Sequence, residues 1–160
     1  MNKKTLSLGF IIAILFAVTA FPTGNSLPTG IADPNMVANG CTCHTDGIMA
    51  SDVVINLTEL PENYNVSQVY TFTLKISGGP EPLEGGNQGG FFIAASYGTL
   101  ESVDNTTQIP EGQTHLTHNA YGNGQREWSF NWTAPESDSK VAVFTVYGNS
   151  VNGNAGSSNG

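Results

Sequence analysis

The densest group of reactive side chains in the sequence is the short block Cys41-Thr-Cys43-His44. It contains both cysteines of the chain and one of its three histidines. Two thiols followed directly by a histidine are typical of c-type haem attachment, in which the thiols form thioethers with the haem vinyl groups and the imidazole binds the iron. The usual form is C-x-x-C-H, and the spacer here is one residue shorter. The block therefore predicts a single haem c, attached through one or both of Cys41 and Cys43, with His44 as the proximal ligand.

Two other interpretations are compatible with the same block. Two thiolates and the imidazole of His44 suit Cu or Zn, although a four-coordinate zinc site needs a further ligand and normally a longer cysteine spacing. A local disulfide between Cys41 and Cys43 is the third interpretation, and it requires an oxidising compartment. Closing so small a ring fits poorly with preferred disulfide geometry. The block is therefore compatible with a haem, with Cu or Zn, and with a disulfide.

A second axial or metal ligand would have to come from another part of the chain. The remaining histidines are His115 and His118, and residues three apart in a strand point to opposite faces, so both are not expected to bind one metal together. We favour His118 as the distal haem ligand, or as a metal ligand together with the block. It precedes the glycine-rich turn at 121–124, which lets another segment approach closely. Met36 and Met49, near the block, are competing ligands.

The composition leaves little room for other classes of function. The chain has 160 residues, 11% of them charged, and a formal net charge of −8. Removing Lys3 and Lys4 with the predicted leader leaves three basic groups against 13 acidic ones, a net charge of −10. Such a surface repels phosphate backbones, so we do not expect nucleic-acid binding. No G-x-S-x-G context or comparable nucleophile–base pair occurs, so we do not expect an enzyme.

The N-terminus predicts export. A positive segment at 1–4 precedes an apolar segment at 6–16, and small residues at 18–20 resemble a cleavage site, so residues 1–20 are predicted to be a signal peptide. No later segment is apolar enough to cross a membrane, so we expect an extracellular or cell-surface protein. Four N-x-[ST] sequons agree with this compartment, although several would arise by chance in a chain rich in these residues: Asn56, Asn65, Asn105 and Asn131.

The segments that follow the block predict β-strands. Val69–Ser77 is the clearest, because its apolar and polar residues alternate and bury one face. Phe91–Tyr97 is apolar on both faces and predicts a fully buried strand. No segment after residue 20 shows the 3.6-residue apolar period of a helix. Further strands are expected at 53–55, at 115–119 as an edge strand, at 127–133 and at 140–147.

Short strands separated by turn residues predict an all-β fold, an antiparallel immunoglobulin-like β-sandwich. We assign residues 21–50 to an extended segment with the Cys/His block, 51–153 to the sandwich and 154–160 to a Gly/Ser/Asn tail. Trp128 and Trp132 share one face of their strand. We expect them in the sandwich core rather than against a haem.

Several strings in this part of the chain resemble the Reeler-like domain, and more closely its secreted microbial relatives of the choice-of-anchor V type. The resemblance covers roughly residues 30–160. It implies an extracellular sandwich with an N-terminal cytochrome-c-like motif, in which Cys41, Cys43 and His44 are the attaching and proximal residues and His118 is the distal candidate. The matching strings are Tyr70-Thr-Phe72-Thr-Leu74, Gly89-Gly-Phe91-Phe92, Gly98-Thr-Leu100, Thr117-His118, Gly124 to Pro135 with its W-x-F-x-W-T-A-P core, Val143-Phe144, and Gly148 to Gly153.

The sequence thus predicts an exported haem-binding protein that works in one-electron transfer with an extracellular redox partner. The alternative is a non-catalytic adhesion or matrix module that contacts a surface protein, with the Cys/His block holding Cu or Zn or forming a disulfide. A glycine-rich connection at 78–90 would then be a candidate contact loop, although a flexible connector is the simpler interpretation.

Overall fold

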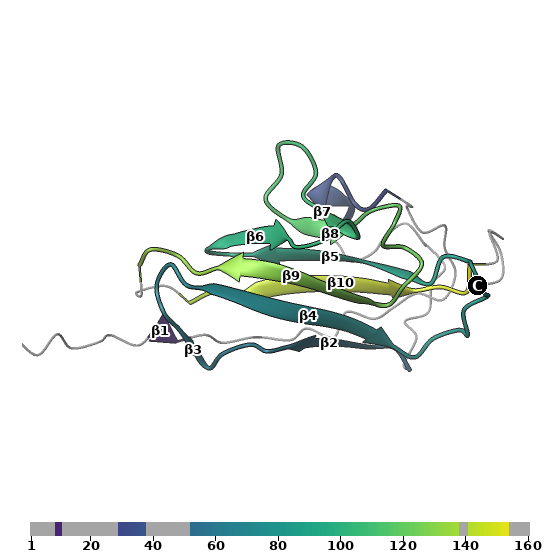
Figure 1. The fold of residues 1–160 in the computed structure, drawn as a ribbon, viewed down its shortest axis with the longest axis horizontal. Coiled ribbons are helices and arrows are strands. Elements are labelled where there is room, and N and C mark those ends of the chain that lie inside the picture. The colour runs from purple at the N-terminus through teal and green to yellow at the C-terminus, as the bar shows by residue number, and fades with distance from the viewer. Residues whose placement is uncertain (1–8, 11–28, 38–51, 138–140, 154–160) are drawn as a thin grey trace, which may run out of the picture.

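The computed structural model describes residues 9–10, 29–37, 52–137 and 141–153 of the chain. Apart from one 3-10 turn, η1 (Pro34–Val37), all regular structure in these ranges is β. Eight strands form two four-stranded antiparallel sheets that lie face to face, one in front of the other in the view of Figure 1. The predicted all-β antiparallel sandwich is confirmed. One sheet has the order β2 (Val54–Thr58), β4 (Val69–Ser77), β9 (Glu127–Thr133) and β6 (Thr99–Ser102), and the other has the order β10 (Phe144–Ser150), β5 (Gly89–Ala95), β8 (Leu116–His118) and β7 (Thr107–Gln108).

The two central strands of the first sheet confirm the predicted alternation, and both have the predicted bounds. On β4, Phe72, Leu74 and Ile76 are buried, while the residues between them face outward. On β9, Trp128 and Trp132 are almost completely buried, which confirms their expected place in the core. Because side chains alternate along a strand, this one-sided burial follows directly from the period of two in the sequence.

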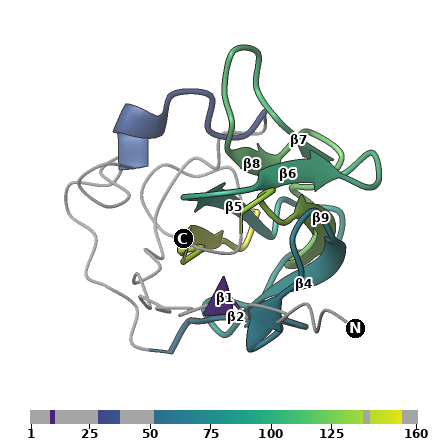
Figure 2. The ribbon, with the colours of Figure 1, turned by 90° about the vertical axis from the view of Figure 1, so that its left-hand side faces the viewer.

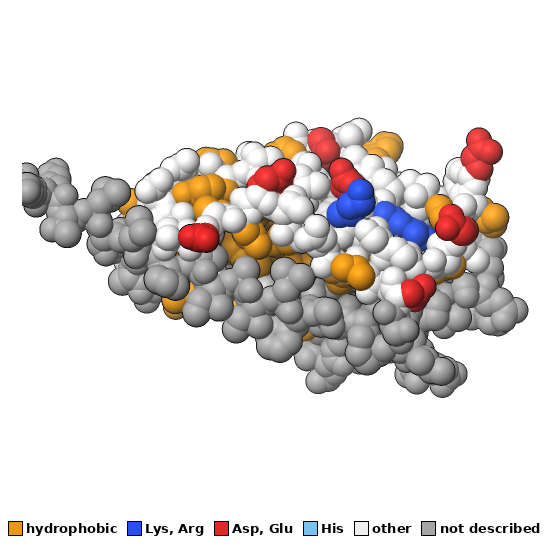
Figure 3. Space-filling view, turned by 90° about the horizontal axis from the view of Figure 1, so that it is seen from below, with side chains coloured by type: hydrophobic (Ala, Val, Ile, Leu, Met, Phe, Trp, Pro, Cys, Tyr) orange, Lys and Arg blue, Asp and Glu red, His pale blue; other side chains and the backbone are white. Residues whose placement is uncertain are grey.

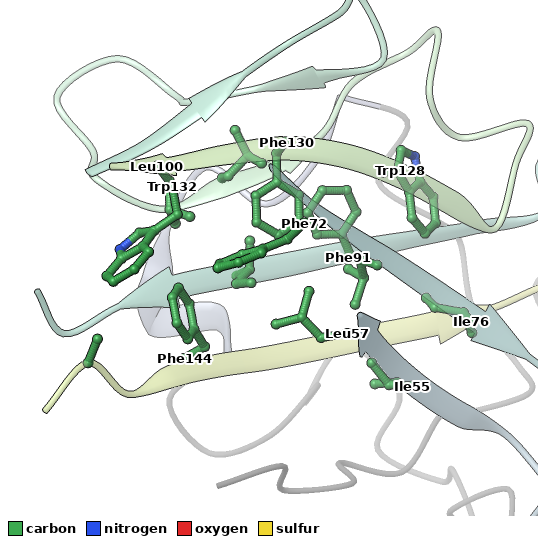
Figure 4. Packing of buried hydrophobic residues seen from close by; sticks show 14 of the residues in the cluster. Ile55, Leu57, Phe72, Ile76, Phe91, Leu100, Trp128, Phe130, Trp132 and Phe144 are labelled. Carbon is green, nitrogen blue, oxygen red and sulfur yellow. The ribbon is translucent and has the colours of Figure 1, made fainter. Parts of the chain in front are cut away.

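The core between the sheets is built mainly from aromatic rings (Figure 4). Phe72 lies at its centre and makes edge-to-face contacts with Phe130 and Phe144, at ring-centroid distances of 6.0 and 5.4 Å. Phe91, from the opposite sheet, packs 4.8 Å from Trp128. These rings bury a large apolar area, and their offset and edge-to-face geometries add to the stabilisation.

The outer face of the first sheet is polar, as expected where one face of an antiparallel sheet meets water. Thr71 donates a hydrogen bond to Asn131 across β4 and β9, at 2.8 Å. Lys75 and Glu127 form an exposed ion pair at 3.2 Å. On the face seen in Figure 3, acidic side chains are scattered rather than gathered in one cluster.

Three strands of the second sheet differ from the sequence prediction. β5 begins and ends two residues earlier than the predicted strand at 91–97. The segment predicted as an edge strand at 115–119 forms β8, which lies inside the sheet because the two-residue strand β7 pairs with its other side. The strand predicted at 140–147 begins and ends later, as β10. It continues through Gly148, which faces the core: a Cβ there would lie 2.7 Å from Cδ1 of Ile76. The sequence predicts no strand at β7 in this sheet or at β6 in the first sheet, which have two and four residues.

A separate pair of two-residue strands, β1 (Gly9–Phe10) and β3 (Asn63–Tyr64), completes the described structure. β1 belongs to the predicted signal peptide, and it pairs with neither four-stranded sheet. Removal of residues 1–20 would therefore leave both sheets with all their strands. Among the described residues, no helix is long and apolar enough to cross a membrane.

Candidate functional site

The Cys41-Thr-Cys43-His44 block and Met49 lie outside the described residues, so the choice between haem, Cu or Zn, and a disulfide stays a prediction. The structure does describe the segment 29–37 that leads into the block, which we call the lead-in, and both remaining histidines. These parts meet at β8. In the two ribbon views, the lead-in lies beside β7 and β8 (Figures 1 and 2).

Side chains of β7, β8 and the residue before β8 hold the lead-in by hydrogen bonds to its backbone. The Gln108 side-chain amide donates to the carbonyl of Thr29. The backbone N–H of Ile31 donates to Thr117 Oγ1 at 3.2 Å, and the carbonyl of Ile31 lies 2.7 Å from His115 Nε2. Each of these bonds joins residues about 80 positions apart in the sequence. They therefore fix the lead-in to the middle of the sandwich domain.

Gly30 permits this close approach. Its φ of 77° lies in the left-handed region that favours glycine, and a Cβ at this position would collide with the carbonyl of His118 and the side chain of Thr117. The lead-in therefore lies directly against the β8 backbone, with no side chain between them.

His118 completes the hydrogen bonding of the neighbouring strand β5. The last residue pair between β5 and β8 is Phe92 with Thr117, so Phe91 has no backbone partner on this side. Its N–H instead donates to His118 Nδ1 at 3.1 Å, and its carbonyl accepts from Thr117 Oγ1 at 2.6 Å. The imidazole lies over Gly90, where a Cβ would come within 2.9 Å of both ring nitrogens. The side chains of Thr117 and His118 thus take the place of one pair of backbone hydrogen bonds between β5 and β8.

This arrangement constrains His118 as a ligand. In a neutral imidazole whose Nδ1 accepts a hydrogen bond, the proton is on Nε2. A histidine that binds a metal through Nε2 ordinarily donates from Nδ1, which is the opposite polarity. To bind iron or another metal through Nε2, His118 would have to give up the bond from Phe91. It is also only 3% exposed. Its role as distal haem or metal ligand stays a prediction, and the structure assigns it a bond that stabilises the sheet.

His115 has a different environment from His118. It is 3% exposed, and its ring stacks on Phe92 with centroids 4.5 Å apart and planes inclined by 28°. Phe92 in turn contacts Tyr147 of β10 at 5.9 Å. Nowhere in the described ranges do three or more His, Cys, Asp or Glu residues gather in a group that could hold a metal ion. The described part of the chain therefore offers isolated imidazoles rather than a preformed metal site.

Arg126 is a structural residue that the sequence prediction missed. It lies just before β9, and its guanidinium donates to the carbonyls of Gly78, Pro80, Gln88 and Val151. Burial lowers its pKa from the usual arginine value, against the opposing effect of Glu81. The only arginine of the sequence thereby joins the 78–90 connection to the end of β10.

The glycine-rich connection at 78–90 is consequently packed against the end of the sandwich. The N–H of Leu83 donates to the carbonyl of Asn152 at 2.9 Å. Gly86 and Gly153 approach so closely that a Cβ on Gly86 would lie 3.1 Å from the Gly153 α-carbon. These contacts hold parts of the connection against the sandwich, and its role as a contact loop or as a flexible connector stays a prediction.

Comparison with known proteins adds the following. No protein-family model matches the sequence, and no curated protein matches it. Among solved structures, the Reelin-N domain of F-spondin is similar at 16% identity over 63% of this chain and 78% of that one, with a TM-score of 0.45. Two fragments of the human F-spondin reeler domain are similar at 14% identity (64% of this chain, 82% of that one, TM-score 0.47) and at 16% identity (60% and 72%, TM-score 0.46).

Proposed function

We propose that this chain is an exported, cell-surface or secreted β-sandwich protein that carries one haem c at the block Cys41-Thr-Cys43-His44 and takes part in one-electron transfer with an extracellular partner. The observation that supports it is the docking of the lead-in on β8, combined with the C-x-C-H pattern. The Reeler-like assignment of the choice-of-anchor V type belongs to this proposal too, and its support is the W-x-F-x-W-T-A-P string.

The docked lead-in limits where the block can lie. Three side-chain contacts fix residues 29–31 to β7 and β8, and η1 follows. Four positions separate Val37 from Cys41, and an extended chain spans at most about 3.6 Å per residue. The α-carbon of Cys41 can therefore be at most about 14 Å from that of Val37. In this proposal, a haem attached to the block would be within reach of the docked lead-in.

The residues of the block have separate tasks in this proposal. The thiols of Cys41 and Cys43 would form the covalent attachment, and the imidazole of His44 would be the proximal ligand. A bound haem would supply one-electron redox chemistry, with its potential set by the axial ligands and by burial. His118 is the distal candidate only if its Nδ1 releases the Phe91 N–H.

A second candidate function is a non-catalytic adhesion or matrix module in which the block binds Cu or Zn or forms a disulfide. The observation that favours it is the environment of the two other histidines. His115 bonds to Ile31 and His118 to Phe91, so both contribute to the sandwich in the described arrangement. A purely structural disulfide or metal at the block would need no ligand from either histidine.

Spectroscopy and mass measurement of the exported full chain separate these functions. In a host that matures c-type haem, we expect a Soret band and a mass increase of one haem that persists after denaturation. A colourless protein of unmodified mass contradicts the haem proposal. Stoichiometric Cu or Zn, or a mass loss of two hydrogens at Cys41 and Cys43, would instead support the second function.

Single variants assign the roles within the block. Cys43→Ala should lose or weaken covalent attachment, and His44→Ala should retain the attached haem but lose its proximal ligation. Thr42→Ala is the matched control, because it keeps both thiols and the imidazole. If His118→Ala leaves a six-coordinate low-spin spectrum unchanged, His118 is not the distal ligand.

A further inference from the structure

The four N-x-[ST] sequons fall into two structural classes. Two lie inside strands of the first sheet, Asn56 on β2 and Asn131 on β9. The other two lie in connections between strands, Asn65 between β3 and β4 and Asn105 between β6 and β7. An acceptor asparagine must enter the active site of a transferase together with its neighbours, so the burial of the whole sequon decides how readily the folded chain can be modified.

Asn65 begins an exposed turn. The N–H of Gln68 donates to its carbonyl at 3.2 Å, and the residues from Asn65 through Gln68 are all exposed. Ser67, the hydroxyl residue of the sequon, has a φ of 57°, which excludes it from the strand that follows. The Asn65 amide nitrogen donates to the exposed Gln68 side chain at 2.9 Å. A surface bond of this kind is easily exchanged for water.

Asn105 lies at a second exposed turn. Asp104 organises this turn by accepting bonds from the N–H and hydroxyl of Thr106, at 2.8 and 2.6 Å. Asn105 itself is exposed, and its carbonyl accepts from the Asn119 side chain at 2.9 Å. The hydroxyl residue of this sequon, Thr107, begins β7: it is 4% exposed, and its Oγ1 lies 2.6 Å from Ser102 Oγ. Although Asn105 is exposed, presenting the whole sequon to an enzyme would require β7 to leave the sheet.

The environment of Asn131 contrasts with the exposed turn at Asn65. It is half-buried on a central strand, paired with Thr71 on one side and with Glu101 on the other. Its side-chain oxygen accepts the hydrogen bond from Thr71. Its strand neighbours Phe130 and Trp132 are core residues. Presenting this sequon to an enzyme would require β9 to leave the sheet, which is equivalent to unfolding the domain.

We propose that Asn65 is an N-glycosylation site of the exported protein, and that Asn105 and Asn131 are not modified once the chain has folded. In the reaction, the side-chain nitrogen bonds to the anomeric carbon of a polyprenyl-phosphate-linked oligosaccharide. The bond from that carbon to the phosphate oxygen breaks, the lipid phosphate leaves, and the amide loses a proton to a base of the transferase. The proposal rests on the export part of the proposed function, because the donor and the enzyme act on exported chains.

A transferase assay on the purified full chain tests the structural selection. With a single-subunit oligosaccharyltransferase and a lipid-linked oligosaccharide, the folded chain should gain a glycan at Asn65 and none at Asn105 or Asn131, as measured by peptide mass spectrometry. The urea-unfolded chain is the matched substrate and should be modified at Asn105 and Asn131 as well. Asn65→Gln should remove the glycan of the folded chain, while Asn123→Gln, which changes a turn asparagine outside any sequon, should leave it in place. Equal occupancy of Asn131 and Asn65 in the folded chain would overturn the proposal.

The exported chain gives the second test. Its intact mass reports both the removal of residues 1–20 and the addition of sugar. An exported chain without its leader and without a glycan at Asn65 overturns the glycosylation proposal alone. A chain that stays in the cell with residues 1–20 attached contradicts export, and both proposals fail together.

Discussion

At the scale of single residues, the pair Thr117-His118 shows how a polar side chain can be buried without loss of stability. A buried polar group is costly unless it is hydrogen-bonded. Both side chains satisfy this condition by binding the backbone of Phe91, whose N–H and carbonyl would otherwise lack partners at the end of the β5–β8 pairing. The same contacts explain why glycine occupies position 90, under the imidazole ring.

Gly90→Ala tests this packing. The added methyl group would overlap the His118 ring, so we expect a loss of about 1–3 kcal/mol in the free energy of unfolding, measured by urea denaturation. Gly124→Ala is the control: its Cβ would lie 4.0 Å from the nearest atom, so the change should stay within about 0.5 kcal/mol. Equal effects of the two substitutions would contradict the proposed role of the His118 ring.

At the scale of elements, the lead-in behaves as an additional segment docked on the second sheet. It contains no strand, and it is held by backbone contacts with Gln108, Thr117 and His115 rather than by a β-ladder. A segment held by few bonds opens more easily than a core strand, so its stability can be changed without unfolding the domain.

Gln108→Ala tests the docking. It removes the bond to the carbonyl of Thr29, so the amide of Ile31 should exchange its hydrogen several-fold faster, while the free energy of unfolding changes by only about 1 kcal/mol. Gln113→Ala, in the loop before β8, is the control and should leave the exchange of Ile31 unchanged. An unaltered exchange rate in Gln108→Ala would show that this bond does not hold the lead-in.

At the scale of the whole molecule, an aromatic core and a half-buried arginine connect the two sheets. The core rings come from both layers, so neither sheet can separate without exposing them (Figure 4). Arg126 adds a polar connection at one end, where its guanidinium reaches carbonyls beside β4, β5 and β10. Such a fork of donors is specific to arginine, because lysine presents a compact charge with a different geometry.

Arg126→Lys should therefore destabilise the sandwich even though the charge is kept. We expect a loss of about 3 kcal/mol in the free energy of unfolding by urea denaturation, because several carbonyls lose their charged donor. Lys75→Met removes the exposed ion pair with Glu127 and should cost no more than about 0.5 kcal/mol. Similar losses in the two variants would contradict the structural role of Arg126.

The sequence by itself determined the elements whose signal is local. The alternation in Val69–Ser77 and Glu127–Thr133 gave the bounds and the buried faces of β4 and β9, because side-chain direction depends only on position along a strand. The all-β sandwich followed from several such segments. Strands as short as β6 and β7 left no pattern, since two to four residues are too few to show a period.

Only the tertiary structure decided what the histidines do. His118 and Phe91 are 27 positions apart, and His115 and Ile31 are 84 apart, so no local pattern could reveal these bonds. The same holds for the four carbonyls gathered around Arg126, and for the separation of the sequons into turn and strand positions. Residue type and spacing indicated which side chains are capable of chemistry, but their partners depend on how the chain folds back on itself, because contact between distant residues is set by packing rather than by sequence neighbours.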